Sequence, residues 1–260
     1  MEQPDRPRRR TPVGRADLRT AWQQNAEAFI AWARKPNHDS YWRFHRDQFL
    51  DLVPRPLGKV LDLGCGEGRL SRDLKELGYD VVGVDASPMM AEAARDAAPG
   101  LDVRLADAAE LPFDDSAFGL VVAFMSLQDI DDVEGAVAEA ARVLRPDGRL
   151  CLAIVHPIGS AGEFEERDAG SPFVIRGSYL ARSRYADDVV RDGLEMTFVS
   201  EHRPIEVYAE ALADAGLLIE RLREPAVPEH AVGEDAVGGE AGRRWQRVPL
   251  FLHVRALKPA

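Results

Sequence analysis

The stretch VLDLGCGEGRL, from Val60 to Leu70, carries three glycines within five positions, directly after an apolar run. Glycine loses more conformational freedom on folding than any other residue, so such a cluster indicates a tight backbone turn or the very close approach of another group. A ligand of the nucleotide type is the obvious candidate. Glycine-rich loops serve several cofactor classes, so the surrounding sequence has to distinguish them.

Strand and helix patterns alternate around this loop, through residues 58–156. Short apolar runs typical of strands occupy 59–64, 80–85, 101–107, 117–124 and 149–155. Helical periodicity fills the intervals 68–78, 88–98 and 131–144. This alternation predicts βαβ units and a parallel sheet. Because such sheets bind ligands beyond the carboxyl ends of their strands, the residues that follow each strand are the candidates for a site.

The flanking segments follow other patterns. Two amphipathic helices are predicted over 20–35 and 41–53, and the pattern from 204 onwards returns to one helix and two strands. Between them lies a long mixed segment in which Asp192 and Gly193 suggest the turn of a two- or three-stranded antiparallel flap. The predicted organisation is a disordered arm (1–18), a helical lid (19–57), a cofactor-binding core (58–156), a substrate-cap insertion (157–204) and a completion of the sheet (205–260).

Composition narrows the functional classes. The 260 residues include 33 basic and 44 acidic side chains, for a net charge of −11, which disfavours a nucleic-acid partner. No apolar run approaches membrane-spanning length, and the arginine-rich start has no apolar segment typical of a secretory signal. Two cysteines give neither a disulfide framework nor a metal-ligand spacing. We therefore expect a cytoplasmic protein, monomeric or homodimeric, without metal, membrane or nucleic-acid partner.

The loop spacing separates two cofactor classes. Asp85 ends the second strand 21 residues after Gly64, the interval at which a carboxylate reaches the ribose of a nucleoside lying over the loop. Dinucleotide folds use G-x-G-x-x-G to receive a pyrophosphate, whereas this loop reads G-C-G-E-G. Glu67 lies within the loop and Asp62 just before it, and their negative charges would repel a phosphate. The pattern suits a nucleoside that carries a positive centre instead, such as S-adenosylmethionine.

Four blocks in order carry a family resemblance: VLDLGCGEGRL, VVGVDASPMM, ADAAELPF and AARVLRPDGRLCLAIV. They resemble the successive signatures of class I S-adenosylmethionine-dependent methyltransferases, in particular the bacterial small-molecule type. The resemblance covers roughly 58–156 and agrees in pattern with 204–258. It implies an α/β fold with a Rossmann-like, seven-stranded, mostly parallel sheet, whose last strand is antiparallel and inserted between strands five and six, with helices on both faces.

The resemblance also implies a set of cofactor-binding residues. The Gly64–Gly68 backbone would lie against the methionine part, Asp62 would brace the loop or meet the ammonium, and Asp85 would hold the ribose diol. Tyr41 and Arg46, in the predicted lid, are candidate contacts of the cofactor carboxylate. The complete predicted set is Tyr41, Arg46, Asp62, Gly64, Cys65, Gly66, Gly68, Asp85, Ala86, Met90, Asp107, Ala108, Phe124, Met125 and Leu127.

Two histidines are candidates for a general base. His156 follows the fifth strand and His202 precedes a predicted helix. A histidine at the sheet edge can remove a proton from an acceptor hydroxyl or amine. A capping or substrate-orienting role is the alternative for His156, and His45, on the apolar face of its helix, reads as a packing residue.

These observations predict a methyltransferase that passes a methyl group from S-adenosylmethionine to an oxygen, nitrogen or carbon of a small molecule, leaving S-adenosylhomocysteine. The methyl donor is already activated, so the protein mainly has to supply approach geometry and exclude water. The alternatives are an RNA or protein methyltransferase, a non-catalytic S-adenosylmethionine-binding regulator and, more distantly, a nicotinamide dehydrogenase. The sequence does not identify the acceptor.

Overall fold

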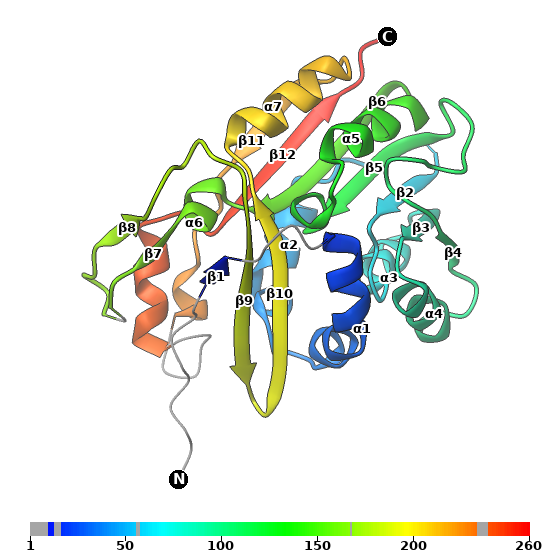
Figure 1. Ribbon diagram of the computed structural model, residues 1–260. Helices are drawn as coiled ribbons and strands as arrows, with labels where there is room; N and C mark the ends of the chain where they lie inside the picture. The colour runs from blue at the N-terminus through cyan, green and yellow to red at the C-terminus, as the bar shows by residue number, and fades with distance from the viewer. Residues whose placement is uncertain (1–9, 13–16, 56–57, 167, 233–238) are drawn as a thin grey trace.

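A central sheet organises the molecule (Figure 1). The computed structural model describes residues 10–12, 17–55, 58–166, 168–232 and 239–260, and within these the sheet has seven strands in the order β11-β12-β6-β5-β2-β3-β4. They are β2 (Val60–Leu63), β3 (Val81–Asp85), β4 (Asp102–Leu105), β5 (Phe118–Phe124), β6 (Leu144–Val155), β11 (Leu218–Arg223) and β12 (Phe251–Leu257). β12 runs antiparallel to both β6 and β11, while β2 to β6 pair in parallel. The predicted fold class is confirmed.

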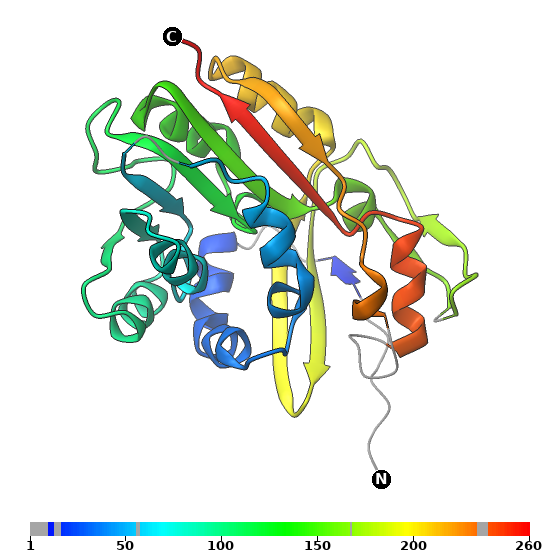
Figure 2. The same cartoon turned by 180° about the vertical axis from the view of Figure 1, so that it is seen from behind.

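Helices cover both faces of this sheet (Figure 2). One face packs against α5 (Val133–Val143) and α7 (Ile205–Asp214). The other packs against α2 (Arg46–Leu50), α3 (Arg69–Glu76) and α4 (Pro88–Ala97). Ser87 and Asp132 are the N-caps of α4 and α5, and the side chain of each accepts a backbone N–H of the first turn. None of the helices in the described part of the chain has the length and apolar character needed to cross a membrane.

The predicted flap is a long hairpin of β9 (Ser183–Arg191) and β10 (Leu194–His202). Asp192 and Gly193 form its turn with positive φ angles of 49° and 78°, as a tight hairpin turn requires. The other short elements are α6 (Pro157–Ala161), β7 (Gly162–Phe164), β8 (Phe173–Ile175), a π-helix at Tyr41–His45 and 3₁₀ helices at Leu127–Asp129, Glu229–Ala231 and Gly239–Gln246.

The flap has a third strand that the sequence did not reveal. β1 (Arg10–Pro12) pairs antiparallel with β9, on the edge that β10 leaves open. The prediction of a disordered arm is therefore wrong for these three residues, because the open edge of β9 offers backbone groups to pair with. Residues 1–9 and 13–16 of the predicted arm lie outside the described residues.

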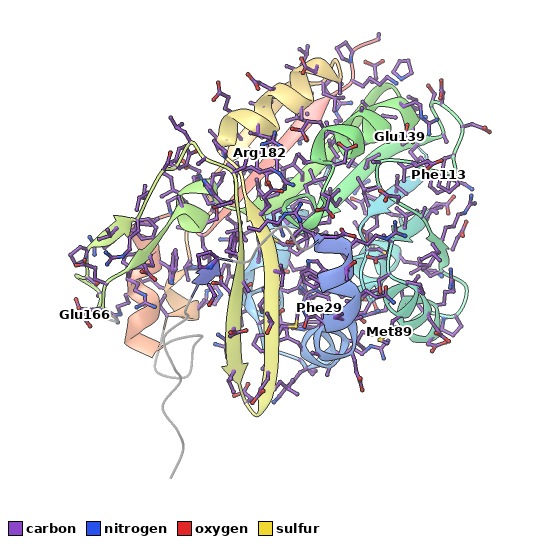
Figure 3. All side chains as sticks on the ribbon, viewed as in Figure 1. Phe29, Met89, Phe113, Glu139, Glu166 and Arg182 are labelled. Atoms are coloured by element: carbon purple, nitrogen blue, oxygen red, sulfur yellow. The ribbon has the colours of Figure 1, made fainter. Side chains whose placement is uncertain are left out.

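Polar contacts tie the flap to the rest of the structure. Arg182, labelled at the root of the flap in Figure 3, forms an ion pair with Glu134 of α5. Trp22, on α1 (Leu18–Arg34), donates its indole N–H to the carbonyl of Val199 at 3.0 Å. Apolar side chains of α1 pack against both flap strands. The predicted lid helix and the predicted cap therefore form one continuous layer.

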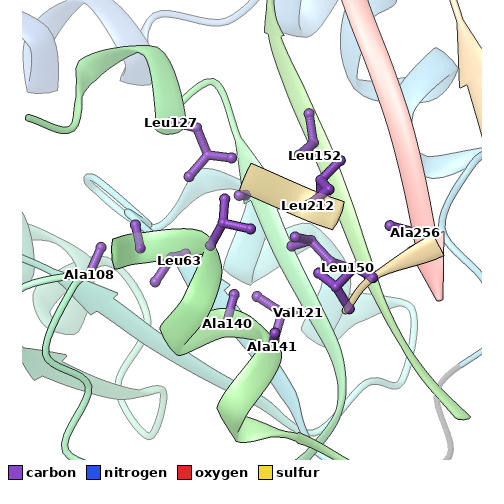
Figure 4. Packing of buried hydrophobic residues seen from close by; sticks show 14 of the residues in the cluster. Leu63, Ala108, Val121, Leu127, Ala140, Ala141, Leu150, Leu152, Leu212 and Ala256 are labelled. Carbon is purple, nitrogen blue, oxygen red and sulfur yellow. The ribbon is translucent and has the colours of Figure 1, made fainter. Parts of the chain in front are cut away.

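The larger core lies between the sheet and helices α5 and α7 (Figure 4). Val121, Leu150 and Leu152 come from neighbouring central strands, and Ala140 and Leu212 from the two helices. Parallel strands buried on both faces read as continuous apolar runs, which is why β5 was recognisable from sequence.

We expect Leu150→Ala to destabilise the protein by about 2–5 kcal/mol, because Leu150 is fully buried and truncation leaves a cavity in the core. Urea unfolding measures the change. Leu180→Ala is the matched control: its side chain is 73% exposed, so the free energy of unfolding should move by no more than about 0.5 kcal/mol. Equal effects of the two substitutions would contradict this description of the core.

Candidate functional site

The glycine loop leaves β2 in a conformation that only glycine adopts easily. Gly64, Gly66 and Gly68 have φ angles of +72°, +57° and +82°. Gly64 also lies too close to Ser126 for a side chain: a Cβ at position 64 would lie 2.5 Å from the Cβ of Ser126. Ser126 in turn donates its hydroxyl to the carbonyl of Leu63 at 2.7 Å. The loop is thus pressed against the turn that follows β5.

Asp85, at the end of β3, fixes the loop from the other side. Its Oδ2 accepts the N–H of Gly66 at 2.8 Å, and its Oδ1 accepts the N–H of Ser87 at 2.9 Å. Burial raises the pKa of this carboxyl, and the backbone N–H donors oppose that rise. Each carboxylate oxygen still has a lone pair for a further donor.

The two other acids of the loop region have different partners. Asp62 is buried behind the loop, where its Oδ2 accepts the hydroxyl of Ser71 at 2.5 Å. Burial, with the charge of Asp85 adding to it, raises the pKa of Asp62 to about 7. Glu67 is also buried but is paired with Arg72 at 2.9 Å and with Arg34 of α1 at 3.2 Å. Glu67 therefore docks the lid helix onto the loop, and its charge is balanced within the protein.

A cavity of about 1270 Å³ opens above the carboxyl ends of the strands. The loop and the strand ends line it on one side, and α1 and the inner faces of β9 and β10 line it on another. Most of the predicted cofactor residues lie in its wall, namely Tyr41, Asp62, Gly64, Cys65, Gly66, Asp85, Ala86, Met90, Asp107, Ala108, Phe124 and Met125. The cavity therefore lies where the sequence predicted a site, beyond the carboxyl ends of the parallel strands; we call this expectation the strand-end rule.

Three predicted residues lie outside the cavity wall. Arg46 faces the other way: its guanidinium pairs with Asp47 at 2.9 Å and lies 3.6 Å from Asp73. Gly68 serves as the N-cap position of α3, and Leu127 is fully buried in the core beneath the cavity. The resemblance implied ligand contacts for Gly68 and Leu127, and the place of Arg46 in the predicted lid suggested one for Arg46; none of the three residues lines the cavity.

The two candidate bases are also absent from the cavity wall in the described part of the chain. His156 caps α6, since its Nδ1 accepts the N–H of Ile158 at 3.1 Å, and its Nε2 lies 2.8 Å from Glu224. His202 is held between the Ser160 hydroxyl at 2.6 Å and the Tyr179 carbonyl at 2.8 Å. Both rings are buried, and the hydrogen bond that His156 makes is the one that caps α6, so for His156 the geometry favours the capping role.

His45 packs in an aromatic cluster, as its helical position suggested. Its ring stacks on Phe251 with centroids 3.6 Å apart, and its Nε2 lies 2.8 Å from the Nε2 of His253. Burial lowers the pKa of both rings, that of His253 to about 4. Both histidines are therefore neutral near pH 7, and one ring donates its N–H to the other.

Sequence reasoning missed several residues of the cavity wall. Arg69 lines the cavity, lies over the ring of Tyr41 at 4.2 Å and pairs with Asp39 at 2.7 Å. Gln128 and Asp129 also line the cavity, as do the aromatic side chains Trp22, Phe29 and Trp32. Gln128 and Asp129 follow β5 within five residues, so the strand-end rule could have found them.

Comparison with known proteins identifies the core. Residues 61–152 match the family described as methyltransferase domain. An uncharacterized methyltransferase of Mycobacterium tuberculosis is 43% identical over 101 residues, which cover 39% of this chain and 41% of that protein. A demethylmenaquinone methyltransferase of Thermus thermophilus is 44% identical over 121 residues, covering 44% and 54%. Residues 61–152 are thus similar in sequence to methyltransferase domains, in line with the resemblance found in the sequence.

The similarity of fold extends beyond residues 61–152. An S-adenosylmethionine-dependent methyltransferase of Mesorhizobium loti has a solved structure that superposes on 84% of this chain and 98% of its own, with a TM-score of 0.68 and 24% identity. In sequence, by contrast, the chain spans about half the length of the two curated relatives. The lid and the flap therefore lie beyond the segment that the family match covers.

We expect Asp62→Asn to gain stability relative to the parent protein as pH rises from about 5 to about 8. Burial raises the pKa of Asp62 to about 7 in the folded state, whereas an unfolded aspartate titrates near pH 3.9. In this range the folded protein holds a proton that the unfolded chain has released, so the parent loses stability with rising pH and the variant escapes this loss.

The gain should reach roughly 3 kcal/mol, read from urea unfolding at the two pH values. Asp96→Asn, which removes an exposed carboxylate, is the control and should leave the pH profile unchanged. A difference between Asp62→Asn and the parent that stays constant with pH would show that Asp62 titrates normally.

Proposed function

We propose that the protein is an S-adenosylmethionine-dependent methyltransferase acting on a small molecule held between the sheet edge and the flap. One observation carries the proposal: the Asp85-braced glycine loop opens into a cavity of about 1270 Å³ whose opposite wall is the flap. Pockets for a single ligand usually measure about 300–1,000 Å³. The volume therefore has room for a cofactor and an acceptor side by side.

The residues of the loop fit the nucleoside part of the cofactor. Each oxygen of Asp85 accepts one backbone N–H and keeps a lone pair for a ribose hydroxyl. At the end of β4, Asp107 and Ala108 line the same wall and would meet the adenine edge. Oδ1 of Asp107 accepts the N–H of Ala109, and Oδ2 lies 3.3 Å from Arg19 of α1. The lid helix would thereby close over the nucleoside.

The other end of the loop fits the amino-acid part. The Gly64–Gly66 backbone and Asp62 would face the methionine, and Arg69 would meet its carboxylate in place of Arg46. Phe124 and Met125 form the floor beyond it. S-adenosylmethionine supplies an activated methyl group on a sulfonium centre when it is bound. The protein would then bind and orient the reactants and shield them from water. Such a transfer requires no nucleophilic side chain of the protein.

The name of a curated relative, the shape of the cavity and the net charge support a small-molecule acceptor. The Thermus thermophilus relative is named for demethylmenaquinone, a small molecule, and the flap closes one side of the cavity instead of leaving an open groove. The net charge of −11 disfavours RNA as the acceptor. We place the protein in the cytoplasm, a proposal supported by its two buried free thiols.

We expect Asp85→Asn to weaken binding of S-adenosylhomocysteine at least about tenfold, because it removes charge-assisted hydrogen bonds to the ribose. Isothermal titration calorimetry measures the affinity, and thermal melting shows whether the variant is folded. Asp80→Asn, at the start of the same strand and exposed, is the control. Unchanged binding by a folded Asp85→Asn variant would refute the ribose assignment.

Transfer itself is tested by incubating the protein with methyl-labelled S-adenosylmethionine and a cell extract, then separating small metabolites, RNA and protein. We expect the label in the small-metabolite fraction. Label in RNA or protein would show that the acceptor is a macromolecule and not a small molecule. The flap would then act as a docking surface for it. Tight cofactor binding with no label in any fraction, across extracts prepared under several growth conditions, would favour a non-catalytic regulator.

A further inference from the structure

Two neighbouring hydrogen-bond acceptors stand in the cavity wall beyond the cofactor floor. Asp129 and Gln128 belong to the turn Leu127–Asp129 that follows β5. Asp129 accepts the hydroxyl of Ser200 from the flap at 2.6 Å and the side-chain amide of Gln128 at 3.1 Å. The same amide donates to the carbonyl of Met125 at 2.7 Å. Both donors of Gln128 are thus used within the turn.

The side-chain oxygen of Gln128 indicates which kind of ligand group would bind at this part of the cavity wall. Gln128 is 4% exposed, and its Oε1 is buried without a hydrogen-bond partner. A buried acceptor without a donor is costly, so an exception of this kind calls for an explanation. Because Gln128 lines the cavity beside the carboxylate of Asp129, a ligand that donates several hydrogen bonds at this point would satisfy both.

We propose, on the basis of the proposed function, that the methyl acceptor is an organic amine whose ammonium group binds Asp129 and the side-chain carbonyl of Gln128. An ammonium group offers several N–H donors and accepts nothing. Once Asp129 is ionised, a carboxylate or phosphate would meet only acceptors here. A neutral hydroxyl offers a single donor and leaves one of the two acceptors unsatisfied.

The charge of the cavity wall favours the same acceptor. Fourteen of the lining residues are aspartate or glutamate, against four arginines. Arg19 and Arg69 are already paired with Asp107 and Asp39. The guanidinium whose charge acts on Asp129 is that of Arg203, which is buried and ion-paired with Glu201 at 2.6 Å. Even with Glu67 neutralised by Arg72 and Arg34, and with the pKa values of Asp62 and Asp129 raised, the lining acids outnumber the lining arginines, so the wall carries a net negative charge.

Aromatic rings complete this part of the wall. Trp22 contacts Phe29 and Phe198 edge-on, with centroids 5.3 Å and 6.4 Å apart, and Trp32 contacts Phe198 at 5.7 Å. All four rings line the cavity. Aromatic faces attract ammonium and methylammonium groups, so substrate and product would both be accommodated.

Asp129 also offers a way for the amine to become nucleophilic. Burial raises the pKa of Asp129 to about 8, while the Ser200 hydroxyl and the charge of Arg203 oppose that rise. Above about pH 8, where Asp129 is ionised, its carboxylate can take one proton from the bound ammonium: an N–H bond breaks, an O–H bond forms on Asp129, and the electron pair stays on nitrogen. The neutral amine is then ready for methylation, and no further co-reactant is needed.

The test is a binding comparison of matched molecules. The protein is titrated calorimetrically, with and without S-adenosylhomocysteine, using 2-phenylethylamine, cyclohexylamine and butylamine, each beside the alcohol and the carboxylate of the same skeleton. We expect amines to bind at least about tenfold more tightly than their counterparts. Asp129→Asn should remove that preference while leaving S-adenosylhomocysteine affinity unchanged.

Gln128→Met provides a second variant that keeps the side-chain length and should weaken the amines alone. Asp114→Asn, which removes an exposed carboxylate, should change nothing. Alcohols or carboxylates binding as tightly as the amines, or an amine preference that survives in folded Asp129→Asn, would overturn the inference. Binding of S-adenosylhomocysteine without amine preference overturns the inference alone, whereas amine preference without nucleoside binding overturns the proposed function alone.

Discussion

The hydrogen bond from the Gly66 N–H to the Asp85 carboxylate is the contact on which the ligand-facing edge of the sheet depends. It joins the loop after β2 to the end of β3, and the second oxygen of Asp85 holds the start of α4 through Ser87. Gly64, on the other side of the loop, is packed so closely against Ser126 that no larger residue fits. Three successive strand ends are thereby fixed relative to one another, and the cavity takes its shape from them.

Electrostatics at this edge follows from where each acid finds a partner. Glu67 is neutralised by Arg72 and Arg34, and so serves the docking of α1. Asp62 is hydrogen-bonded by Ser71, and burial raises its pKa to about 7. Two acids that look alike in the sequence therefore have different surroundings: arginines balance the charge of Glu67, and burial reduces the charge of Asp62 near pH 7. Both would repel a phosphate less than the sequence suggests.

The expectation that ligands bind beyond the carboxyl ends of the strands identified most residues of the cavity wall. It failed for residues whose side chains are held by contacts outside that wall. Asp85 and Phe124 lie in the cavity wall because the carboxyl ends of parallel strands meet at one edge. Arg46 was misplaced because a helical pattern says which face is apolar but not what each polar side chain meets; its partners are Asp47 and Asp73. His156 follows a strand as the rule requires, yet its ring turns back to cap α6.

The sequence by itself determined the order of strands and helices, the glycine loop and the resemblance of the core to methyltransferases, because periodicity and short motifs are local properties of the chain. Only the tertiary structure decided which side chains share the cavity. Contacts such as Ser200 with Asp129, or Trp22 with Val199, join residues more than seventy positions apart. The pairing of β1 with β9 is of the same kind. Long-range contacts depend on how the elements pack, and no local pattern encodes that packing.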